Sequence, residues 1–349
     1  MELQKGNRAL NILYVTTGRV NPDGALYYPP LVSNQINSLK PFLKSSFIII
    51  ISSLKPHFLL KKIKELRQMS AHYDIVHAQY GSLTALIAFL GRKGRPLIIS
   101  FGGSDLLGSS GKGFNWMVRN WITRNLGLLA AHRCNKIIVK SESLKMNLPE
   151  DLHGLVAIIP NGVDLNVFYP RDKREVRTKL GWKLDDFYVL FTPSRANNVL
   201  VKNLPLANAV IDLVREKVNN VYLEFILDKA PEQVATLMNG ADCLLLTSLH
   251  EGSPNVIKEA MACNLPIVTV NVGDVYERLK EVLNSYVIDS YEKELLSEKV
   301  ITLLNKHTRT NGLEQLKKQN LTSEDVAKKI WNVYNEVFDD DRRSQEKRP

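Results

Sequence analysis

Cysteines and long apolar runs are scarce in this chain of 349 residues. Its three cysteines are Cys134, Cys243 and Cys263, and no two of them form a C-x-x-C pair. This argues against a disulfide framework and a zinc site and favours a reducing compartment. No apolar run approaches the roughly 20 residues that a membrane span requires, and residues 1–10 lack the apolar core of a signal peptide. We therefore expect a cytoplasmic protein that does not span a membrane.

Several cofactor and metal motifs are also missing. No G-x-G-x-x-G follows the first apolar run, which disfavours a nicotinamide-dependent enzyme. The glycine-rich stretch Gly108–Gly113 lacks the G-x-x-x-x-G-K-[ST] spacing of a phosphate-binding loop. No H-E-x-x-H motif or clustered Asp/His set suggests a catalytic metal. We expect neither a metal nor a cofactor.

Acidic residues are few in the first half of the chain. Residues 1–160 hold 20 Lys and Arg against 8 Asp and Glu, whereas residues 161–349 hold 26 against 28. The excess comes mainly from Leu54–Arg67 and from Leu106–Ser141, which contains no acidic residue. Both segments mix cations with apolar side chains such as Trp121, which suits a membrane surface. The basic half predicts an anionic partner, such as an acidic membrane, a phosphorylated substrate or nucleic acid.

Short apolar runs alternate with longer amphipathic stretches along the whole chain. The runs are Ile12–Thr16, Phe47–Ser52, Ile75–Ala78, Leu97–Phe101, Lys136–Val139, Val156–Ile159, Tyr188–Thr192, Val221–Ile226, Cys243–Leu246, Pro266–Val270 and Tyr286–Ile288. Continuous apolar runs separated by helices indicate parallel sheets that are covered on both faces. Because the pattern occurs twice, we predict an α/β protein with two doubly wound, Rossmann-like domains that face a cleft.

The domain boundary is expected in the segment with proline and glycine between Pro160 and Phe187. A further helix is expected to start at Ser323, which is a good N-cap followed by two acidic residues. We therefore predict a first domain over residues 1–165 and a second domain over residues 166–322. The final helix is expected over residues 323–338, followed by a charged tail over residues 339–349.

The strongest chemical signal lies in the second half, after the run that ends at Leu246. Ser253 is a good N-cap and Pro254 suits the first helical position, so we expect a short helix whose N-terminus forms an anion site. Glu251 precedes this helix, and Glu259 lies about 7 Å along it at ~1.5 Å per residue. Carboxylates accept hydrogen bonds from hydroxyls. A ligand that places phosphate at the helix end and hydroxyls beside it is a nucleotide-sugar. The alternative is that Glu251 and Glu259 are ordinary surface glutamates on a solvated helix.

Other loops that follow apolar runs hold weaker candidates. Arg195 and Lys202 are placed to contact a diphosphate, unless they are ordinary surface cations. Asn161 lies in a tight Pro-Asn-Gly turn, which forms either a hinge or part of the cleft wall. In the first half, the adjacent glycines Gly102 and Gly103 permit close approach of the backbone to a ligand. His77 and Asp105 are the acid or base candidates there.

Four stretches of the chain resemble retaining, nucleotide-sugar-dependent glycosyltransferases of the GT-B fold, glycosyltransferase family four. The most specific stretch contains the E-x7-E motif of that family, EGSPNVIKEAMACNLPIVTVNVGD (Glu251–Asp274). The supporting stretches are DIVHAQYG (Asp74–Gly81), SFGGSDLLG (Ser100–Gly108) and IIPNGVDLNVFYP (Ile158–Pro170). The resemblance covers residues 10–338 and includes the Arg195/Lys202 pair.

The resemblance implies a role for each matching residue. Glu251 would contact hydroxyls of the donor sugar and Glu259 those of the ribose, and the Arg195/Lys202 pair would neutralise the diphosphate leaving group. Further donor-binding positions are Gly252, Ser253, Pro254, Asn255, Val256 and Asn161, and acceptor-side positions are Gly18, His77, Gly102 and Gly103. The first domain would bind the acceptor and the final helix would cross back to it. The reaction would retain the anomeric configuration without a metal, and UDP is favoured over GDP as the donor nucleotide.

The chain departs from this family in two places. Many relatives carry a histidine in the loop where this chain reads Phe101–Asp105, so Asp105 is the substitute catalytic candidate. The loop after the first strand is also poor in glycine, with only Gly18 and Gly24. These loops resemble those of enzymes for bacterial capsule, exopolysaccharide or O-antigen, which predicts a glycan or lipid-linked acceptor and a peripheral position on the inner face of the cell membrane. The alternatives are a GT-B-fold UDP-sugar epimerase and a non-catalytic nucleic-acid-binding protein; the latter explains the charge but not the E-x7-E segment.

Overall fold

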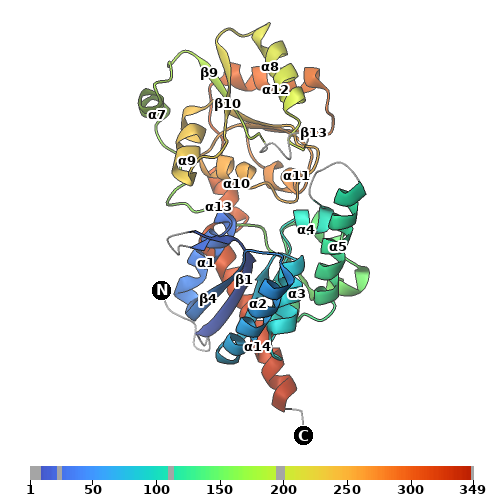
Figure 1. Ribbon diagram of the computed structural model, residues 1–349. Coiled ribbons are helices and arrows are strands. Elements are labelled where there is room, and N and C mark those ends of the chain that lie inside the picture. The colour runs from blue at the N-terminus through green and yellow to red at the C-terminus, as the bar shows by residue number, and fades with distance from the viewer. Residues whose placement is uncertain (1–8, 22–25, 109–113, 194–200, 347–349) are drawn as a thin grey trace. The chain divides into compact units, whose positions relative to one another are not determined.

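The computed structural model describes residues 9–21, 26–108, 114–193 and 201–346. The chain divides into two compact units, of which the first comprises residues 1–161 and 323–349 and the second residues 162–322. Each unit is built on a parallel sheet flanked by helices (Figure 1). This confirms the predicted α/β class with two Rossmann-like domains.

The sheet of the first unit has the strand order β4-β1-β5-β6-β7-β8, and all its pairs are parallel. The strands are β1 (Leu10–Thr17), β4 (Leu43–Ile51), β5 (Ile75–Gln79), β6 (Leu97–Ser100), β7 (Lys136–Val139) and β8 (Val156–Ile158), with a separate antiparallel pair β2 (Arg19–Val20) and β3 (Leu26–Tyr27). The helices are α1 (Pro30–Leu39), α2 (Pro56–Met69), α3 (Leu83–Gly91), α4 (Ser104–Leu107), α5 (Phe114–Ala131), α6 (Glu142–Lys145) and α14 (Ser323–Glu346).

The two faces of this sheet pack against different helices. In β1, Leu13 and Val15 belong to a core shared with α2, α3 and α5, whereas Ile12 and Tyr14 belong to a core shared with α1 and α14. Successive side chains of a strand point to opposite faces, so a strand covered on both faces is apolar throughout. On the second face, α1 and α14 lie side by side (Figure 1), which anchors the last helix to the first sheet.

The sheet of the second unit has the order β10-β9-β11-β12-β13 and is also parallel. The strands are β9 (Phe187–Phe191), β10 (Val221–Phe225), β11 (Cys243–Leu246), β12 (Ile267–Val270) and β13 (Ser285–Ile288). The helices are α7 (Lys173–Leu180), α8 (Leu204–Arg215), α9 (Pro231–Gly240), α10 (Asn255–Ala262), α11 (Val275–Leu279), α12 (Lys293–Lys306) and α13 (Gly312–Lys318).

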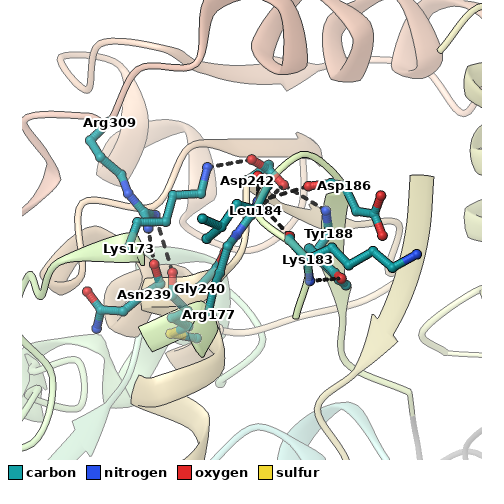
Figure 2. A network of polar contacts seen from close by, with 11 residues as sticks. Lys173, Arg177, Lys183, Leu184, Asp186, Tyr188, Asn239, Gly240, Asp242 and Arg309 are labelled. Carbon is teal, nitrogen blue, oxygen red and sulfur yellow. Dashed lines mark hydrogen bonds and ion pairs between the residues drawn. The ribbon is translucent and has the colours of Figure 1, made fainter. Parts of the chain in front are cut away.

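A buried polar network centred on Asp242 joins α7 and α9 to this sheet (Figure 2). The carboxylate of Asp242 accepts hydrogen bonds from Arg177 Nη2 at 2.7 Å and from Lys173 Nζ at 2.5 Å. It also accepts the backbone N–H of Tyr188, the second residue of β9, at 2.7 Å. Arg177 further donates through Nε to the carbonyl oxygen of Gly240 at 2.8 Å. The network therefore connects the start of β11 with the neighbouring strand and with both helices.

The final helix is longer than predicted. It continues to Glu346, whereas we expected it to end at residue 338. Side chains one turn apart contact each other in the added turns, with Arg343 Nη1 at 3.7 Å from Asp340 Oδ1 and Gln345 Nε2 donating to Asp341 Oδ2 at 2.6 Å. Such pairs support a helix, so the charge of this segment does not end it. No helix in the described parts of the chain has both the length and the hydropathy to cross a membrane.

Candidate functional site

In the second unit, Lys202 in the segment between β9 and α8 meets Glu251 in the segment between β11 and α10. Lys202 Nζ lies 2.5 Å from Glu251 Oε1, and the two side chains are 21% and 16% exposed. The pair therefore stands at the carboxyl edge of the sheet, where ligands of open α/β sheets bind. Each charge offsets the other in the free protein and remains partly accessible to a ligand.

The backbone around Lys202 is held against the end of β11. Thr247 Oγ1 donates to the carbonyl oxygen of Lys202 at 2.9 Å and to that of Asn203 at 3.1 Å. The N–H of Leu249 donates to the carbonyl oxygen of Val201 at 2.8 Å. These three hydrogen bonds place the Lys202 side chain next to the loop that carries Glu251.

The same loop is packed against the one that follows β12. Gly273 has a φ of +62°, and a Cβ there would lie 2.6 Å from the carbonyl oxygen of Gly252 and 2.9 Å from that of Glu251. Both the positive φ and this close contact require glycine. The backbone of Glu251, a predicted catalytic residue, and of Gly252, a predicted donor-binding position, is thus packed against Gly273.

The start of α10 differs from the prediction in one respect. Pro254 is the N-cap and the helix begins at Asn255, so Ser253 is not the N-cap residue. The hydroxyl of Ser253 instead accepts a hydrogen bond from Lys258 Nζ at 3.0 Å, which removes it from capping. Val256 is buried in the core of the unit. The first turn of α10 still supplies backbone N–H groups without acceptors inside the helix, the arrangement that favours anions.

Glu259 is the second carboxylate of the motif and lies on α10. Burial raises its pKa to about 7, against the opposing effect of the neighbouring Lys258 ammonium. Burying a carboxylate without a full set of hydrogen-bond donors disfavours its ionised form. Glu259 is therefore ready to accept hydrogen bonds from hydroxyl groups that a ligand would bring.

Two hydroxyl groups that sequence reasoning missed lie at the carboxyl ends of neighbouring strands. The Oγ1 of Thr192, next to β9, and the Oγ of Ser248, two residues past β11, are buried without a hydrogen-bond partner among the described residues. The available signal was their position, since Thr192 is the last residue of an apolar run and Ser248 lies two residues after another. Arg195, the other predicted diphosphate contact, lies outside the described residues, so its role stays a prediction.

In the first unit, Asp105 organises the loop that follows β6. Its carboxylate accepts the backbone N–H groups of Gly102 at 3.0 Å and of Gly103 at 2.8 Å. It also accepts the N–H of Gly81, at the start of α3, at 2.7 Å. Burial raises the pKa of Asp105, and these hydrogen bonds act against that rise. These contacts give Asp105 a positioning role, and its catalytic role stays a prediction.

His77 is fully buried between the sheet and α14. Its Nδ1 lies 2.7 Å from the hydroxyl of Tyr334, and its Nε2 lies 2.8 Å from Ser100 Oγ. Burial, together with the charge of Lys140, lowers the pKa of His77 to about 3, so the imidazole is neutral at physiological pH. Both ring nitrogens of His77 are therefore engaged within the protein, and its acceptor-side role stays a prediction.

A cavity of about 140 Å³ opens at the carboxyl ends of β5, β6, β7 and β8 in the first unit. It is lined by side chains of the strand ends and of α1, including Gln35, Gln79, Tyr80, Ser100, Lys140 and Asn161, and by Gly102. Asn161, which we expected on the donor side, therefore lines a cavity of the first unit. Gly18 and Gly103 are not among its lining residues; a Cβ at Gly18 would lie 2.4 Å from the carbonyl oxygen of Tyr27, so this glycine allows the β2-β3 pair to fold back.

Lys140 is the residue of this cavity that sequence reasoning assigned only to a basic segment. It follows directly after the apolar run Lys136–Val139, so its place at a strand end was visible in the sequence. No group of three or more His, Cys, Asp or Glu residues that could hold a metal ion occurs in the described part of the chain.

Two family models match the chain, one within the second unit and one mainly in the first. Residues 173–320 match glycosyl transferases group 1, and residues 32–167 match Glycosyltransferase Family 4. An uncharacterized glycosyltransferase of Methanocaldococcus jannaschii is 24% identical over 334 residues, which cover 89% of this chain and 87% of that protein.

Solved structures with the same fold include two that match nearly the whole chain. Sucrose-phosphate synthase from Thermosynechococcus elongatus has a TM-score of 0.72 at 15% identity and covers 94% of this chain and 99% of its own. HepE from Anabaena, in complex with UDP-glucose, has a TM-score of 0.67 at 18% identity and covers 94% of this chain and 100% of its own.

Proposed function

We propose that the chain is a glycosyltransferase of group 1 with the GT-B fold and an N-terminal domain of the family 4 type, and that it transfers a sugar from a UDP-sugar to a glycan or lipid-linked acceptor. The second unit would bind the donor and the first unit the acceptor. The reaction would retain the anomeric configuration, without a metal, in the synthesis of a bacterial surface polysaccharide. Neither the epimerase nor the nucleic-acid-binding alternative is favoured by the family matches.

The observation that carries the donor assignment is the Lys202–Glu251 pair, in which Glu251 lies four residues before α10 begins. An ammonium group beside a helix N-terminus attracts phosphate oxygens, and a carboxylate beside it accepts hydrogen bonds from hydroxyls. Diphosphate and sugar hydroxyls are adjacent in a nucleotide-sugar. The complex of HepE with UDP-glucose supports UDP as the nucleotide.

The chemistry would follow from this placement. When the donor's diphosphate leaves, negative charge develops on its oxygens, and Lys202 and Arg195 would offset that charge. Glu251 would hold the donor sugar through its hydroxyls, and Glu259 would hold the ribose. Attack by the acceptor hydroxyl on the face from which the diphosphate departs would retain the configuration, and the departing phosphate oxygen would take the proton.

A thermal-shift series with nucleotides tests the donor assignment. UDP at 100 times its dissociation constant should stabilise the protein by roughly 2.7 kcal/mol, and GDP and ADP should stabilise it less. Lys202→Met should weaken UDP binding, whereas Lys217→Met, at an exposed lysine of the same unit, should not. Equal shifts for all three nucleotides in both variants would contradict the assignment.

The reaction type is tested separately by mass spectrometry of the products formed from UDP-glucose and other UDP-sugars. A transferase yields UDP and a product with a new glycosidic bond when an acceptor mixture is supplied. An epimerase changes the UDP-sugar without an acceptor. Activity that persists in EDTA is expected, and complete loss on chelation would contradict the metal-independent proposal.

An exposed apolar stripe on α5 supports the proposed peripheral membrane contact. Gly127 lies against the sheet side of the unit, because a Cβ there would meet the carbonyl oxygen of Gly81 at 1.3 Å. The opposite side of the helix carries apolar side chains that face solvent, with Trp121 67% and Leu129 57% exposed. Aromatic and aliphatic side chains on a helix that also carries arginines suit the surface of an anionic bilayer.

Helix α2 adds positive charge on the same side of the first sheet, since both α2 and α5 pack on α3. Lys61 and Lys64 are exposed there, next to Leu60, which is 67% exposed. Each lysine or arginine near an anionic membrane contributes about 1 kcal/mol, and salt screens this attraction. A lipid-linked acceptor would be presented at the same surface.

Vesicle sedimentation tests the membrane proposal. The protein should bind phosphatidylglycerol-containing vesicles at low salt and leave neutral phosphatidylcholine vesicles unbound. Trp121→Ser should weaken this binding, and the control Leu283→Ser, at a leucine that is 65% exposed on the second unit, should not. A gel shift with DNA and RNA is run beside it; tight nucleic-acid binding without vesicle binding would reject the membrane proposal.

A further inference from the structure

The cavity of the first unit contains a buried cation without an ion-pair partner among the described residues. Lys140 is 7% exposed, and among the described residues it makes no ion pair or hydrogen bond that would satisfy its ammonium group. Burial lowers its pKa to about 8, against the attraction of the Asp105 carboxylate. The ammonium is therefore charged at neutral pH although its burial is unfavourable. Buried charges are normally paired, so a partner from outside the protein is expected.

Two amide groups on the cavity wall are also unsatisfied. Gln79, 5% exposed at the end of β5, has its Nε2 buried without a hydrogen-bond partner, and so does Gln35 on α1. An amide nitrogen is a donor only. With Lys140, the cavity thus presents three donor groups and an excess positive charge.

The Asp105 carboxylate attracts the Lys140 ammonium but forms no ion pair with it among the described residues. Asp105 uses its oxygens to accept the N–H groups of Gly81, Gly102 and Gly103. Ser100 Oγ is engaged with His77, and that imidazole is neutral. The cavity of about 140 Å³ exceeds about tenfold the 10–15 Å³ that one water molecule needs, so a group larger than water fits.

We propose that this cavity holds an oxyanion carried by the acceptor, either a carboxylate or a phosphate. Lys140 supplies the opposite charge, and the amides of Gln79 and Gln35 donate hydrogen bonds to the oxygens. This assignment rests on the proposed acceptor role of the first unit. It makes the acceptor an acidic or phosphorylated sugar rather than a neutral one.

The test compares three soluble ligands that share one sugar ring: glucose 6-phosphate, glucuronate and glucose. Each is titrated calorimetrically into the full chain in the presence of excess UDP, which fills the proposed anion site of the second unit. At least one of the two anionic sugars should bind more than tenfold tighter than glucose. Binding of glucose 6-phosphate alone identifies the anion as phosphate, and binding of glucuronate alone identifies it as carboxylate.

Two variants locate this binding. Lys140→Met keeps the apolar stem and removes the charge, and it should weaken the preferred anionic sugar at least tenfold. Gln79→Leu should weaken it several-fold. The matched control is Lys328→Met, at an exposed lysine of α14 in the same unit, and it should leave the affinity unchanged.

Two results would overturn the proposal: neither anionic sugar binds the wild-type chain more tightly than glucose, or Lys140→Met and Gln79→Leu bind the preferred anion as tightly as the wild type. Circular dichroism identifies a variant that does not fold, and the other variant then decides. UDP binding is measured in the same series. Loss of UDP binding with retained, Lys140-dependent anion binding would reject the donor assignment and not this one.

Discussion

Arg177 in the second unit and Lys140 in the first are both almost completely buried, at 3% and 7% exposure, but their surroundings are opposite. Arg177 donates to the Asp242 carboxylate and to carbonyl oxygens of Gly240, Leu184 and Asp186, as Figure 2 shows. Lys140 faces a cavity and has no such partner among the described residues.

The difference distinguishes Arg177, a structural cation, from Lys140, which we propose binds a ligand. A buried charge whose hydrogen bonds are all made inside the protein holds the elements around it together, and removing it leaves its partners unpaired. A buried charge without a partner lowers the stability of the free protein, and it is tolerated where a ligand supplies the missing charge. The free energy of unfolding of single variants measures this distinction.

Arg177→Met should give the largest loss of stability, about 3–5 kcal/mol. The substitution leaves Asp242 with fewer donors and leaves three carbonyl oxygens without their guanidinium partner. Urea denaturation followed by circular dichroism measures this loss. Arg174→Met, at an exposed arginine of the same helix, should stay within about 0.5 kcal/mol of the wild type. Equal effects of the two variants would contradict a structural role for Arg177.

Glu259→Gln should instead stabilise the free protein, by about 1–3 kcal/mol at pH 8. The folded-state pKa of Glu259, about 7, lies above its unfolded value. The stability linked to its protonation is therefore present at low pH and is lost as the pH rises through 7. The gain of the variant should shrink toward pH 4, and its affinity for UDP should fall. A Glu259→Gln variant that is less stable than the wild type at pH 8 would show that the Glu259 carboxylate has its hydrogen-bond donors inside the protein.

Lys140→Met should raise the free energy of unfolding at pH 7 by about 1 kcal/mol, because it removes a buried unpaired charge. The folded-state pKa of Lys140, about 8, lies below its unfolded value, so the destabilisation is present below pH 8 and fades as the pH rises toward 10. The pKa of His77 is about 3 and that of Tyr80 is raised above its usual 10, so neither group charges in that range. Thermal unfolding at pH 7 and pH 10 measures the change. A large loss of stability at pH 7 would place Lys140 in the structural class with Arg177.

Glu251→Gln should change stability least, by less than about 1 kcal/mol, because its ion pair with Lys202 is partly exposed. Turnover should fall about tenfold or more, the equivalent of one charge-assisted hydrogen bond. Steady-state kinetics beside urea denaturation separates the two effects. Unchanged turnover in a folded variant would remove Glu251 from the donor site.

The parallel sheets were predictable because their signals are local, and so was the proximity of the residues of the proposed donor segment, Glu251–Asp274. The run Lys136–Val139 coincides with β7, since a central strand covered on both faces is apolar over its whole length. Glu251 and Glu259 lie in one continuous motif that spans a loop and a helix, so their neighbourhood is set by a few consecutive residues. Ser253 was wrongly predicted as the N-cap, because the competing contact with Lys258 depends on how α10 packs.

The sequence by itself determined the order of strands and helices, the fold class and the segment proposed to bind the donor, since apolar periodicity and short motifs act over a few residues. Only the tertiary structure decided which charged and polar groups are satisfied. Arg177 meets Asp242 across 65 positions of the chain, and His77 meets Tyr334 across 257. Lys140 stands at a strand end like many other residues, and its lack of a partner follows from how α1 and the strand ends pack around it. Hydrogen bonds and charges act over a few ångströms, and only folding brings such distant groups within that range.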